Sequence, residues 1–454
     1  MSLPPFYIVP LTHSDWEDAR TYAKKLPNEA IAEVRLDLTP DADPEYLVDS
    51  LKRRCVVSSR RVSEGGRWPD EDEAGRLESI KKALKGRPQW IDLEWDLEIP
   101  DWLEAELTHT RLLRSFHAPP AVFDLEARLR EPPRGDAYKW VGHASRLSDN
   151  THVKSSLAWA RDHHIALSAF LTGNKGIVSR CMQAAWGGAF VYAAPDNAAA
   201  SAPGQLKLGT MTAWRCHKLH PSYGLCGVLG SPVIQSAGPA FHNLRFQRSF
   251  KDLIYLPLEA QTPAEAMDAM KSLSLLGASV TMPLKETLSA ILNFSAPINT
   301  LWRRADGDAW QATSTDAEAL EFYIKDFQGG PVLVLGSGGV AKTSMRVIEK
   351  RGWPALQCSR RSPAPVADVA RFAPAGVIQA TSLGMGEDDP MPFPEVLEAA
   401  LPSLRWAAEW VNSDATAFSA WASGAGLQLL SGAELFEKQA ALQSRIFVTE
   451  CGGL

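Results

Sequence analysis

The chain has 454 residues, of which 45% are hydrophobic and 22% charged, with a net charge of −6. This length exceeds one ordinary hydrophobic core and predicts two or three domains. No apolar run approaches the roughly 18–20 residues that cross a bilayer, the amino-terminal residues lack the pattern of a secretory signal, and no basic block marks a nucleic-acid binder. We therefore expect a cytoplasmic protein that binds small molecules and has no nucleic-acid or membrane partner.

The six cysteines are scattered without paired spacing, which is typical of reduced intracellular thiols. Cys216, His217 and His220 form the one cluster with metal-ligand residue types. No fourth ligand lies at the spacing found in zinc fingers, so we expect no metal site there.

Eight apolar, β-branched-rich runs recur in the first part of the chain, with helix-like patterns such as 15–25, 71–84 and 155–163 between them. The runs are Phe6–Leu11, Ala30–Leu38, Arg54–Arg60, Gln89–Leu97, Arg111–His117, Tyr138–His143, Ile165–Thr172 and Gly188–Ala194. Strands that alternate with helices in this number predict a (β/α)₈ (TIM) barrel.

Lys139 lies inside one of these apolar strands, where a lysine is unfavourable unless it is paired or functional. A buried neutral amine can attack a ketone, and the resulting iminium acidifies the adjacent carbon. His117, one predicted strand away, could remove that proton, and Glu94 could orient its ring. Arginines at the same mouth, Arg35, Arg60 and Arg180, suit a substrate carboxylate and hydroxyl groups.

Several segments here match one family pattern: Glu33-Val34-Arg35, Arg60 followed by Glu64-Gly65-Gly66, Asp92-Leu93-Glu94, Ser115-Phe116-His117, the strand lysine Lys139, Ser179-Arg180 and Ala202-Pro203-Gly204-Gln205. Over about residues 1–208 the chain resembles type I 3-dehydroquinate dehydratase. The resemblance implies metal-free dehydration of 3-dehydroquinate to 3-dehydroshikimate, with Lys139 as the Schiff-base lysine, His117 as the general acid/base and Glu94 as its partner. It also implies substrate contacts by Glu33, Arg35, Arg60, Arg180, Ser201 and Gln205.

A final barrel helix and a linker are expected between residues 206 and 222, and a new unit starts at Tyr223. Farther on, a strand at 332–335 is followed by Gly336-Ser337-Gly338-Gly339-Val340-Ala341 and a helical pattern over 342–350. Such a turn lets backbone N–H groups approach a pyrophosphate. The next predicted strand, 355–358, ends in Ser359-Arg360-Arg361 rather than an acidic residue, which favours NADP over NAD.

Upstream of this turn, a short strand ending in Thr281 leads to Lys285 at the start of a helix, and Asn299 and Asp316 follow. A lysine beside an aspartate could relay the proton that accompanies hydride transfer to a ketone. From about Tyr223 to the C-terminus the chain resembles shikimate dehydrogenase.

That second resemblance implies a substrate domain over 222–325, completed by a C-terminal helix at about 430–454, and a Rossmann domain over 326–429. It implies Lys285 and Asp316 as the catalytic pair. The implied substrate contacts are Ser236, Thr281, Asn299 and Gln439. The implied cofactor contacts are Gly336, Gly338, Gly339, Ala341, Ser359, Arg360, Arg361, Thr381, Ser382, Met385 and Gly432.

At five positions the sequence departs from the dehydrogenase pattern: Gly238, Ser279, Ser314, Gln379 and Val411. Lost hydroxyl or amide partners can weaken substrate binding or change which hydroxy acid fits.

The two activities in pathway order indicate one bifunctional enzyme, and the sequence leaves open whether it forms a homodimer. One alternative is a non-catalytic sensor of pathway intermediates derived from these enzymes, but such a protein should have lost Lys139, His117, Lys285 or Asp316. Another is a dehydrogenase half that prefers quinate.

Overall fold

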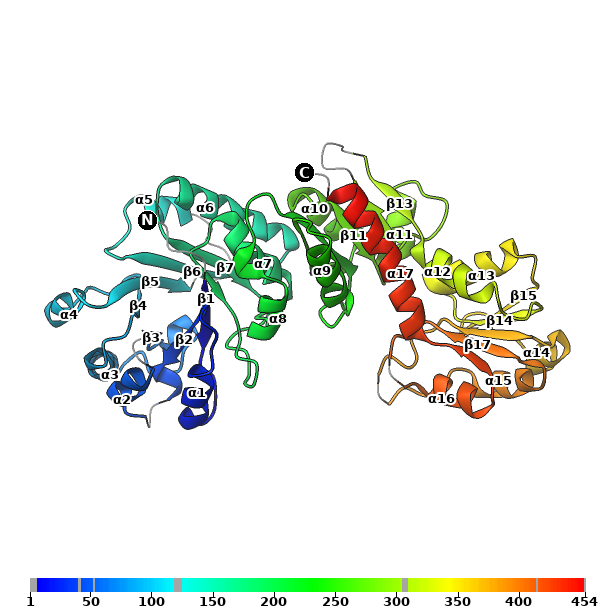
Figure 1. Ribbon diagram of the computed structural model, residues 1–454, viewed down its shortest axis with the longest axis horizontal. Coiled ribbons are helices and arrows are strands. Elements are labelled where there is room, and N and C mark those ends of the chain that lie inside the picture. Colours follow the sequence, from blue (N-terminus) through cyan, green and yellow to red (C-terminus); the bar gives the residue numbers. More distant parts are fainter. Residues whose placement is uncertain are drawn as a thin grey trace.

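The computed structural model describes residues 6–39, 42–51, 54–117, 125–303, 309–386, 388–413 and 415–452. Residues 1–5 and 453–454, the outer ends of the expected first domain and C-terminal helix, lie outside this range. Three sheets follow one another along the chain. Figure 1 shows the barrel at one end of the long axis, the second unit in the middle and the third at the far end.

The first sheet confirms the predicted barrel. It contains eight parallel strands in the order β7-β6-β5-β4-β3-β2-β1-β8. Their bounds are β1 Phe6–Pro10, β2 Ala30–Arg35, β3 Cys55–Ser58, β4 Trp90–Glu94, β5 Arg111–His117, β6 Ala137–His143, β7 Leu167–Thr172 and β8 Phe190–Tyr192. The amide of Ala189 donates to the carbonyl of Leu167 at 2.7 Å and the Ser168 hydroxyl donates to the carbonyl of Phe190 at 2.8 Å, so the last strand nearly closes the ring.

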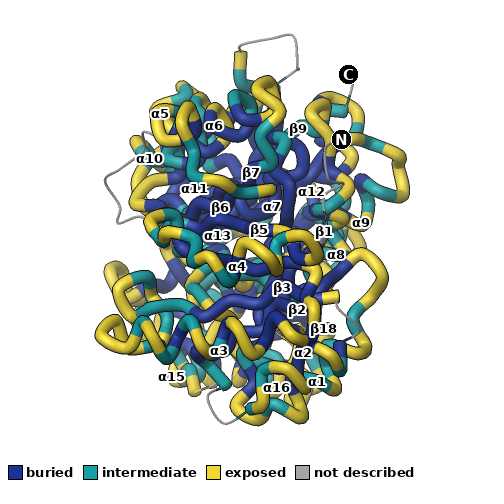
Figure 2. The backbone as a smooth tube through the Cα atoms, turned by 90° about the vertical axis from the view of Figure 1, so that its left-hand side faces the viewer, coloured by how far each residue is buried: buried dark blue, intermediate teal, exposed yellow. Residues whose placement is uncertain are grey.

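Side-chain alternation along the strands decides which residues face the barrel interior. The inner cluster contains Ile31, Trp90 and Leu113, among others, and Figure 2 shows the strands as the buried centre of this unit. Residues two positions farther along the same strands share that face, and they include Glu33 and Asp92. The sequence thus lines the base of the barrel with apolar groups and its carboxyl-end mouth with polar ones.

Helices cover the outside of the barrel: α1 Trp16–Ala23, α2 Pro44–Ser50, α3 Glu73–Lys85, α4 Asp101–Glu106, α5 Leu125–Arg130, α6 Asn150–Asp162, α7 Ile177–Trp186 and α8 Leu208–Ala213. Helix α6 begins at Asn150 rather than at the expected Ser155. The buried Asn150 amide donates to the carbonyls of Leu147 and Lys175 and accepts from the amide of Ser179, which fixes the start of α6 against the next loop.

The second unit has a mixed sheet in the order β10-β9-β11-β12-β13, in which β12 and β13 are antiparallel to their neighbours. Its strands are β9 Gly224–Gly230, β10 Leu253–Glu259, β11 Gly277–Val280, β12 Thr300–Trp302 and β13 Gln311–Thr313, and its helices are α9 Gly238–Arg248, α10 Pro263–Ser272, α11 Leu284–Ile291 and α12 Thr315–Ile324.

The third unit is a parallel Rossmann-like sheet in the order β15-β14-β16-β17-β18. It consists of β14 Val332–Leu335, β15 Ala355–Cys358, β16 Gly376–Gln379, β17 Trp406–Glu409 and β18 Gln428–Leu430, with helices α13 Gly339–Lys350, α14 Val366–Phe372, α15 Pro394–Ala400 and α16 Ala417–Gly424. The two strands predicted around the glycine turn are confirmed, whereas α13 starts three residues before the expected position, at Gly339. The last helix, α17 Gly432–Ile446, returns to pack on α12 and α9 of the second unit (Figure 1).

The barrel contacts the second unit through the loop after β7. The Asn174 amide donates to Glu259 at 2.8 Å, and the Lys175 ammonium donates to Glu265 at 3.0 Å. This loop leaves the carboxyl end of a barrel strand, so the mouth of the barrel and the second unit share a boundary.

Candidate active sites

Lys139 projects from β6 into the barrel and is only 2% exposed. Its Nζ lies 3.2 Å from Asp92 Oδ2 and 3.6 Å from Glu33 Oε1, and 4.5 Å from the centre of the Tyr192 ring. Burial alone would raise the pKa of Glu33, but the charges of Lys139, Arg60 and Arg35 lower that pKa to about 2. The amine is therefore held in one place by two buried carboxylates and an aromatic face.

His117 ends β5, and its Nδ1 lies 2.7 Å from Glu64 Oε2. Both side chains are 12% exposed. Burial, followed by the charges of Arg60, Lys139 and Arg35, lowers the pKa of His117 well below its usual value. Burial and the charge of Glu94 raise the pKa of Glu64 to about 7. When the ionised Glu64 carboxylate accepts a hydrogen bond from Nδ1–H, the other ring nitrogen, Nε2, carries no proton and can act as a base. Nε2 is buried and has no described partner.

The expected pairing of His117 with Glu94 is wrong in this structure. Glu94 instead accepts from the fully buried Arg76 of α3 at 2.8 Å and lies 3.7 Å from Arg61. Because Arg76 comes from outside the barrel wall, it draws the Glu94 carboxylate toward α3, and the loop after β3 supplies the carboxylate for His117.

Glu64 joins the candidate site although no role was expected for it from the sequence. It ends the short turn Val62–Glu64, and Gly65 follows with a φ of +77°. A Cβ on Gly66 would lie 2.0 Å from the carbonyl oxygen of Arg60. The Glu-Gly-Gly segment is therefore the signal for this residue, since only glycine lets the chain turn tightly enough to return Glu64 over the mouth.

Three expected substrate arginines surround the same mouth. Arg35 is held by a bidentate pair with Asp37 at 2.8 and 2.6 Å, and Arg60 lies 3.8 Å from Glu33. Arg180 is buried at the start of α7, where its guanidinium carbon lies 4.5 Å from the Phe170 ring centre. Burial lowers the pKa of Arg180 to about 10, and its Nη2 is buried without a described partner, so this cation suits an anionic ligand.

Ser201 and Gln205 lie in the loop after β8 and contact each other. The amide and hydroxyl of Ser201 donate to Gln205 Oε1 at 3.0 and 2.8 Å. The amide of Gly173, after β7, donates to the carbonyl of Pro203 at 3.0 Å. The structure thus attaches these two residues to the neighbouring loop, and it records no bond from them to Lys139 or His117 among the described residues.

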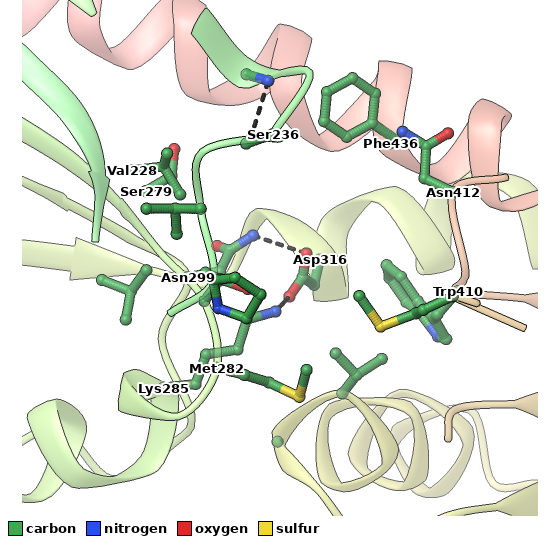
Figure 3. Close-up of a pocket in the computed structure, with 18 of the residues that line it drawn as sticks. Val228, Ser236, Ser279, Met282, Lys285, Asn299, Asp316, Trp410, Asn412 and Phe436 are labelled. Atoms are coloured by element: carbon green, nitrogen blue, oxygen red, sulfur yellow. Dashed lines mark hydrogen bonds and ion pairs between the residues drawn. The ribbon is translucent and has the colours of Figure 1, made fainter. Parts of the chain in front are cut away.

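The second candidate site is a cavity of about 1470 Å³ between the second and third units. Lys285 at the start of α11 donates to Asp316 Oδ2 at 2.6 Å, and Asn299 Nδ2 donates to Asp316 Oδ1 at 2.7 Å (Figure 3). The two bonds fix both carboxylate oxygens of Asp316. The structure therefore brings together the expected lysine and aspartate in the wall of one cavity.

The expected substrate residues of this half line the same cavity: Ser236, Thr281, Asn299 and Gln439. Gln439 comes from α17, and its Oε1 accepts from Asn299 Nδ2 at 3.3 Å. Because α17 returns to the second unit, Gln439 lies beside Asn299, which is 140 positions earlier in the chain.

The glycine turn between β14 and α13 forms the opposite wall. Gly336 has a φ of +118°, and a Cβ there would lie 2.6 Å from the carbonyl oxygen of Ala380. A Cβ on Gly338 would meet no atom within 4 Å, so the space before the N-terminus of α13 is open. A Cβ on Gly339 would lie 3.3 Å from Cβ of Lys285, so the turn adjoins the lysine. This space and the helix N-terminus fit a pyrophosphate.

The other expected cofactor residues divide into two groups. The first group lines the cavity together with Gly338 and Gly339: Arg361, Thr381, Ser382, Met385 and Gly432. Ala341 is buried inside α13, and the Ser359 hydroxyl accepts from the amide of Ser362 within its own turn. Arg360 is exposed and outside the cavity lining, so of the two neighbouring arginines only Arg361 faces the site.

Four departures from the dehydrogenase pattern have local partners. Ser314 caps α12 by accepting from the amide of Ala317 at 3.3 Å, and Gln379 binds the backbone of Thr381 and Leu383. Ser279 bonds to two buried side chains, and the Gly238 amide donates to the Ser236 hydroxyl at 3.1 Å. Val411 lines the cavity and is nearly buried.

Within the described ranges, no group of three or more His, Cys, Asp or Glu side chains could hold a metal ion. In the Cys216 to His220 segment, His217 Nδ1 lies 2.7 Å from the Tyr7 hydroxyl, which is a structural contact. No helix in the described part of the chain is both long and apolar enough to span a bilayer.

Comparison with known families identifies two parts of the chain. Residues 7–214 match the family model of type I 3-dehydroquinase, and residues 228–298 match that of the shikimate dehydrogenase substrate binding domain. The chain joins these two families. It is a bifunctional shikimate-pathway enzyme, a lyase followed by an oxidoreductase.

Several solved structures are similar to the chain at low sequence identity. A dehydroquinate dehydratase and shikimate dehydrogenase from S. pombe is 17% identical, with 99% of this chain and 96% of that chain covered and a TM-score of 0.40. A shikimate dehydrogenase from Aquifex aeolicus is 20% identical over 51% of this chain and 94% of its own, with a TM-score of 0.43. A 3-dehydroquinate dehydratase from Geobacillus kaustophilus is 18% identical over 46% and 88%, with a TM-score of 0.40.

Proposed function

We propose that Lys139 forms a Schiff base with 3-dehydroquinate and that the His117–Glu64 pair moves the protons of its dehydration. The observation that carries this proposal is the pairing of a buried, doubly held lysine with a neighbouring histidine whose Nε2 is buried and without a described partner. Glu64 takes the place that the sequence analysis gave to Glu94.

The steps follow from these positions. The ammonium of Lys139 gives up one proton, and its neutral Nζ attacks the ketone; that proton leaves with the former carbonyl oxygen as water when the iminium forms. The iminium then draws electrons from the adjacent carbon as His117 Nε2 removes a proton from that carbon. The same imidazole, now protonated, returns its proton to the departing hydroxyl, which leaves as water. Hydrolysis of the iminium then releases 3-dehydroshikimate and frees Lys139. Arg180 and Arg60 carry the charges that suit the substrate carboxylate.

For the second site, we propose reduction of 3-dehydroshikimate at the Lys285–Asp316 pair. Lys285 donates a proton to the substrate oxygen as the carbonyl carbon is reduced, and Asp316 holds the ammonium at 2.6 Å. Asn299 binds the other Asp316 oxygen and keeps the carboxylate from turning away.

The cofactor that fits this cavity is NADP. Gly338 and Gly339 leave the N-terminus of α13 open for a pyrophosphate, and Arg361 offers a cation where an acidic residue would bind an unmodified ribose. When bound, the reduced cofactor supplies the hydride. Thr381, Ser382, Met385 and Gly432 complete the lining on that side.

A reducing compartment is supported by the cysteines, because all six are free and buried. We therefore propose a cytoplasmic location and small molecules as the ligands, with monomer and homodimer both open as the assembly. Size-exclusion chromatography with light scattering tests the assembly directly.

Borohydride trapping tests the Schiff base. Reduction in the presence of 3-dehydroquinate should add the mass of the reduced ligand to the peptide that contains Lys139, and Lys139→Arg should remain unlabelled. A label on a different lysine, or none at all, would refute the assignment.

A further inference from the structure

A residue of the barrel lies in the wall of the dehydrogenase cavity. It is Asn174, in the loop between β7 and α7, and the same wall includes Glu259 at the end of β10. Asn174 Nδ2 donates to Glu259 Oε2 at 2.8 Å, and Ser231 Oγ donates to Glu259 Oε1 at 3.2 Å. One carboxylate thus joins the barrel to the residue that follows β9.

The loop that carries Asn174 is fixed to the barrel on both sides. Gly173 has a φ of +83°, and its amide donates to the carbonyl of Pro203 at 3.0 Å. The side-chain amide of the fully buried Asn150 donates to the carbonyl of Lys175 at 2.8 Å. The backbone on either side of Asn174 is therefore held by barrel contacts, and its side chain projects from a rigid base.

The boundary between the barrel and the second unit does not depend on Asn174. One buried apolar cluster contains Ile177 of α7 together with Leu256 and Leu258 of β10. In addition, the Lys175 ammonium donates to Glu265 of α10 at 3.0 Å. Burial of apolar surface is the main source of stability at such a boundary, so the bond from Asn174 to the cavity wall is not needed to hold the two units together.

The turn between β9 and α9 begins directly opposite Glu259. Gly230, the last residue of β9, is the register partner of Glu259 across the parallel pair. Residues 231–237 form no helix or strand, and they lead to Ser236, an expected substrate contact whose hydroxyl accepts from the amide of Gly238 (Figure 3). Because no backbone ladder holds this turn, the bond from Ser231 to Glu259 ties it to β10 and so fixes where Ser236 lies.

We propose that Asn174 is a positioning residue of the dehydrogenase that the dehydratase half supplies: through Glu259 and Ser231 it fixes the turn that carries Ser236. An amide nitrogen suits this task, because it gives the carboxylate a donor and adds no charge to the cavity. This inference rests on the proposed dehydrogenase function, and it adds that the substrate cavity of one activity is completed by a residue of the other.

The test measures NADP-linked oxidation of shikimate by variants of the full chain. Asn174→Ala should raise the KM for shikimate by about 3- to 10-fold, the effect of one lost hydrogen bond, with kcat and the KM for NADP little changed. Asn174→Asp should raise the KM for shikimate further, since two carboxylates would then face each other. Combining Asn174→Asp with Glu259→Gln restores one donor and one acceptor with their roles reversed, and it should bring this KM back toward the wild-type value.

Lys175→Met is the matched control, because Lys175 lies in the same loop but bonds to Glu265, outside the cavity lining. It should leave the KM for shikimate unchanged, and the dehydratase activity of each variant reports that the chain has folded. Hydrogen exchange of residues 231–236, measured without substrate, should be faster in Asn174→Ala than in the wild type and unchanged in Lys175→Met.

Three results would overturn the role of Asn174 alone: an unchanged KM for shikimate in both Asn174 variants, equal effects of Asn174→Ala and Lys175→Met, or no rescue by Glu259→Gln. A wild type that does not oxidise shikimate would instead overturn the proposed dehydrogenase function. In that case faster exchange of residues 231–236 in Asn174→Ala would still support the link from the barrel to the turn.

Discussion

Replacing Glu64 and Glu94 in turn by glutamine shows which of the two carboxylates is the partner of His117. Glu64→Gln keeps the size of the side chain but removes the charge that lies 2.7 Å from His117 Nδ1. A hydrogen bond to a charged group contributes about 1.5–3 kcal/mol, so its loss should lower kcat for dehydration by about 10- to 150-fold. Formation of the conjugated enone from 3-dehydroquinate, followed by its ultraviolet absorbance, measures this rate.

Glu94→Gln is the matched control. It leaves the His117 contact in place and removes one partner of the buried Arg76, which keeps Glu73. We expect a loss of stability of about 3 kcal/mol in the barrel, read from the thermal midpoint, and a smaller loss in kcat than Glu64→Gln causes.

The pH profile adds a second readout. Below the pKa of Glu64, raised to about 7 by burial and by Glu94, the protonated carboxyl donates to Nδ1 and Nε2 cannot act as the base. Dehydration should therefore rise with pH through about 7, and Glu94→Gln should move this rise to lower pH. If Glu94→Gln abolished turnover while Glu64→Gln left it unchanged, the pairing of His117 with Glu64 would be wrong.

Three further changes test other parts of the two sites. Arg361→Ser should lower kcat/KM for NADPH by about tenfold or more with little effect on NADH, and the exposed Arg360→Ser should leave both unchanged; equal effects of the two variants would refute the role of Arg361. Asp316→Asn should lower kcat for ketone reduction by about 10²- to 10⁴-fold and spare dehydration, so full reductase activity would count against the Lys285–Asp316 pair. In the folded protein the pKa of Glu33 is about 2, against an ordinary 4.5. Its contribution to the free energy of unfolding is therefore present above about pH 4.5 and is lost as the pH falls toward 2. That contribution is about 3 kcal/mol, and acid titration of Glu33→Gln should lack this part of the decline.

The barrel was predictable because its signal is local. Each strand is an apolar run whose length and spacing are set by the need to bury one face, and all eight appear near their predicted positions. The start of α6 was missed because it depends on Asn150, whose hydrogen bonds reach a loop that lies far along the chain. Local periodicity carries no information about such a contact.

A site residue was predictable where its own position, on a strand or at the start of a helix, is enough to bring its side chain to the site. Lys139 and Lys285 are of this kind, and the structure places each beside a carboxylate. The partner of His117 was not, because the choice between Glu94 and Glu64 depends on Arg76 reaching through the barrel wall from α3.

The measurement that tests the central claim most directly is oxidation of NADPH by the purified chain when 3-dehydroquinate is the only other substrate. The wild type should oxidise the cofactor after a lag in which 3-dehydroshikimate forms. Lys139→Met should oxidise none until 3-dehydroshikimate is added, and Lys285→Met should form the enone but leave the cofactor reduced even then. Cofactor oxidation by Lys139→Met from 3-dehydroquinate, or none by the wild type, would contradict the assignment of two consecutive activities to this one chain.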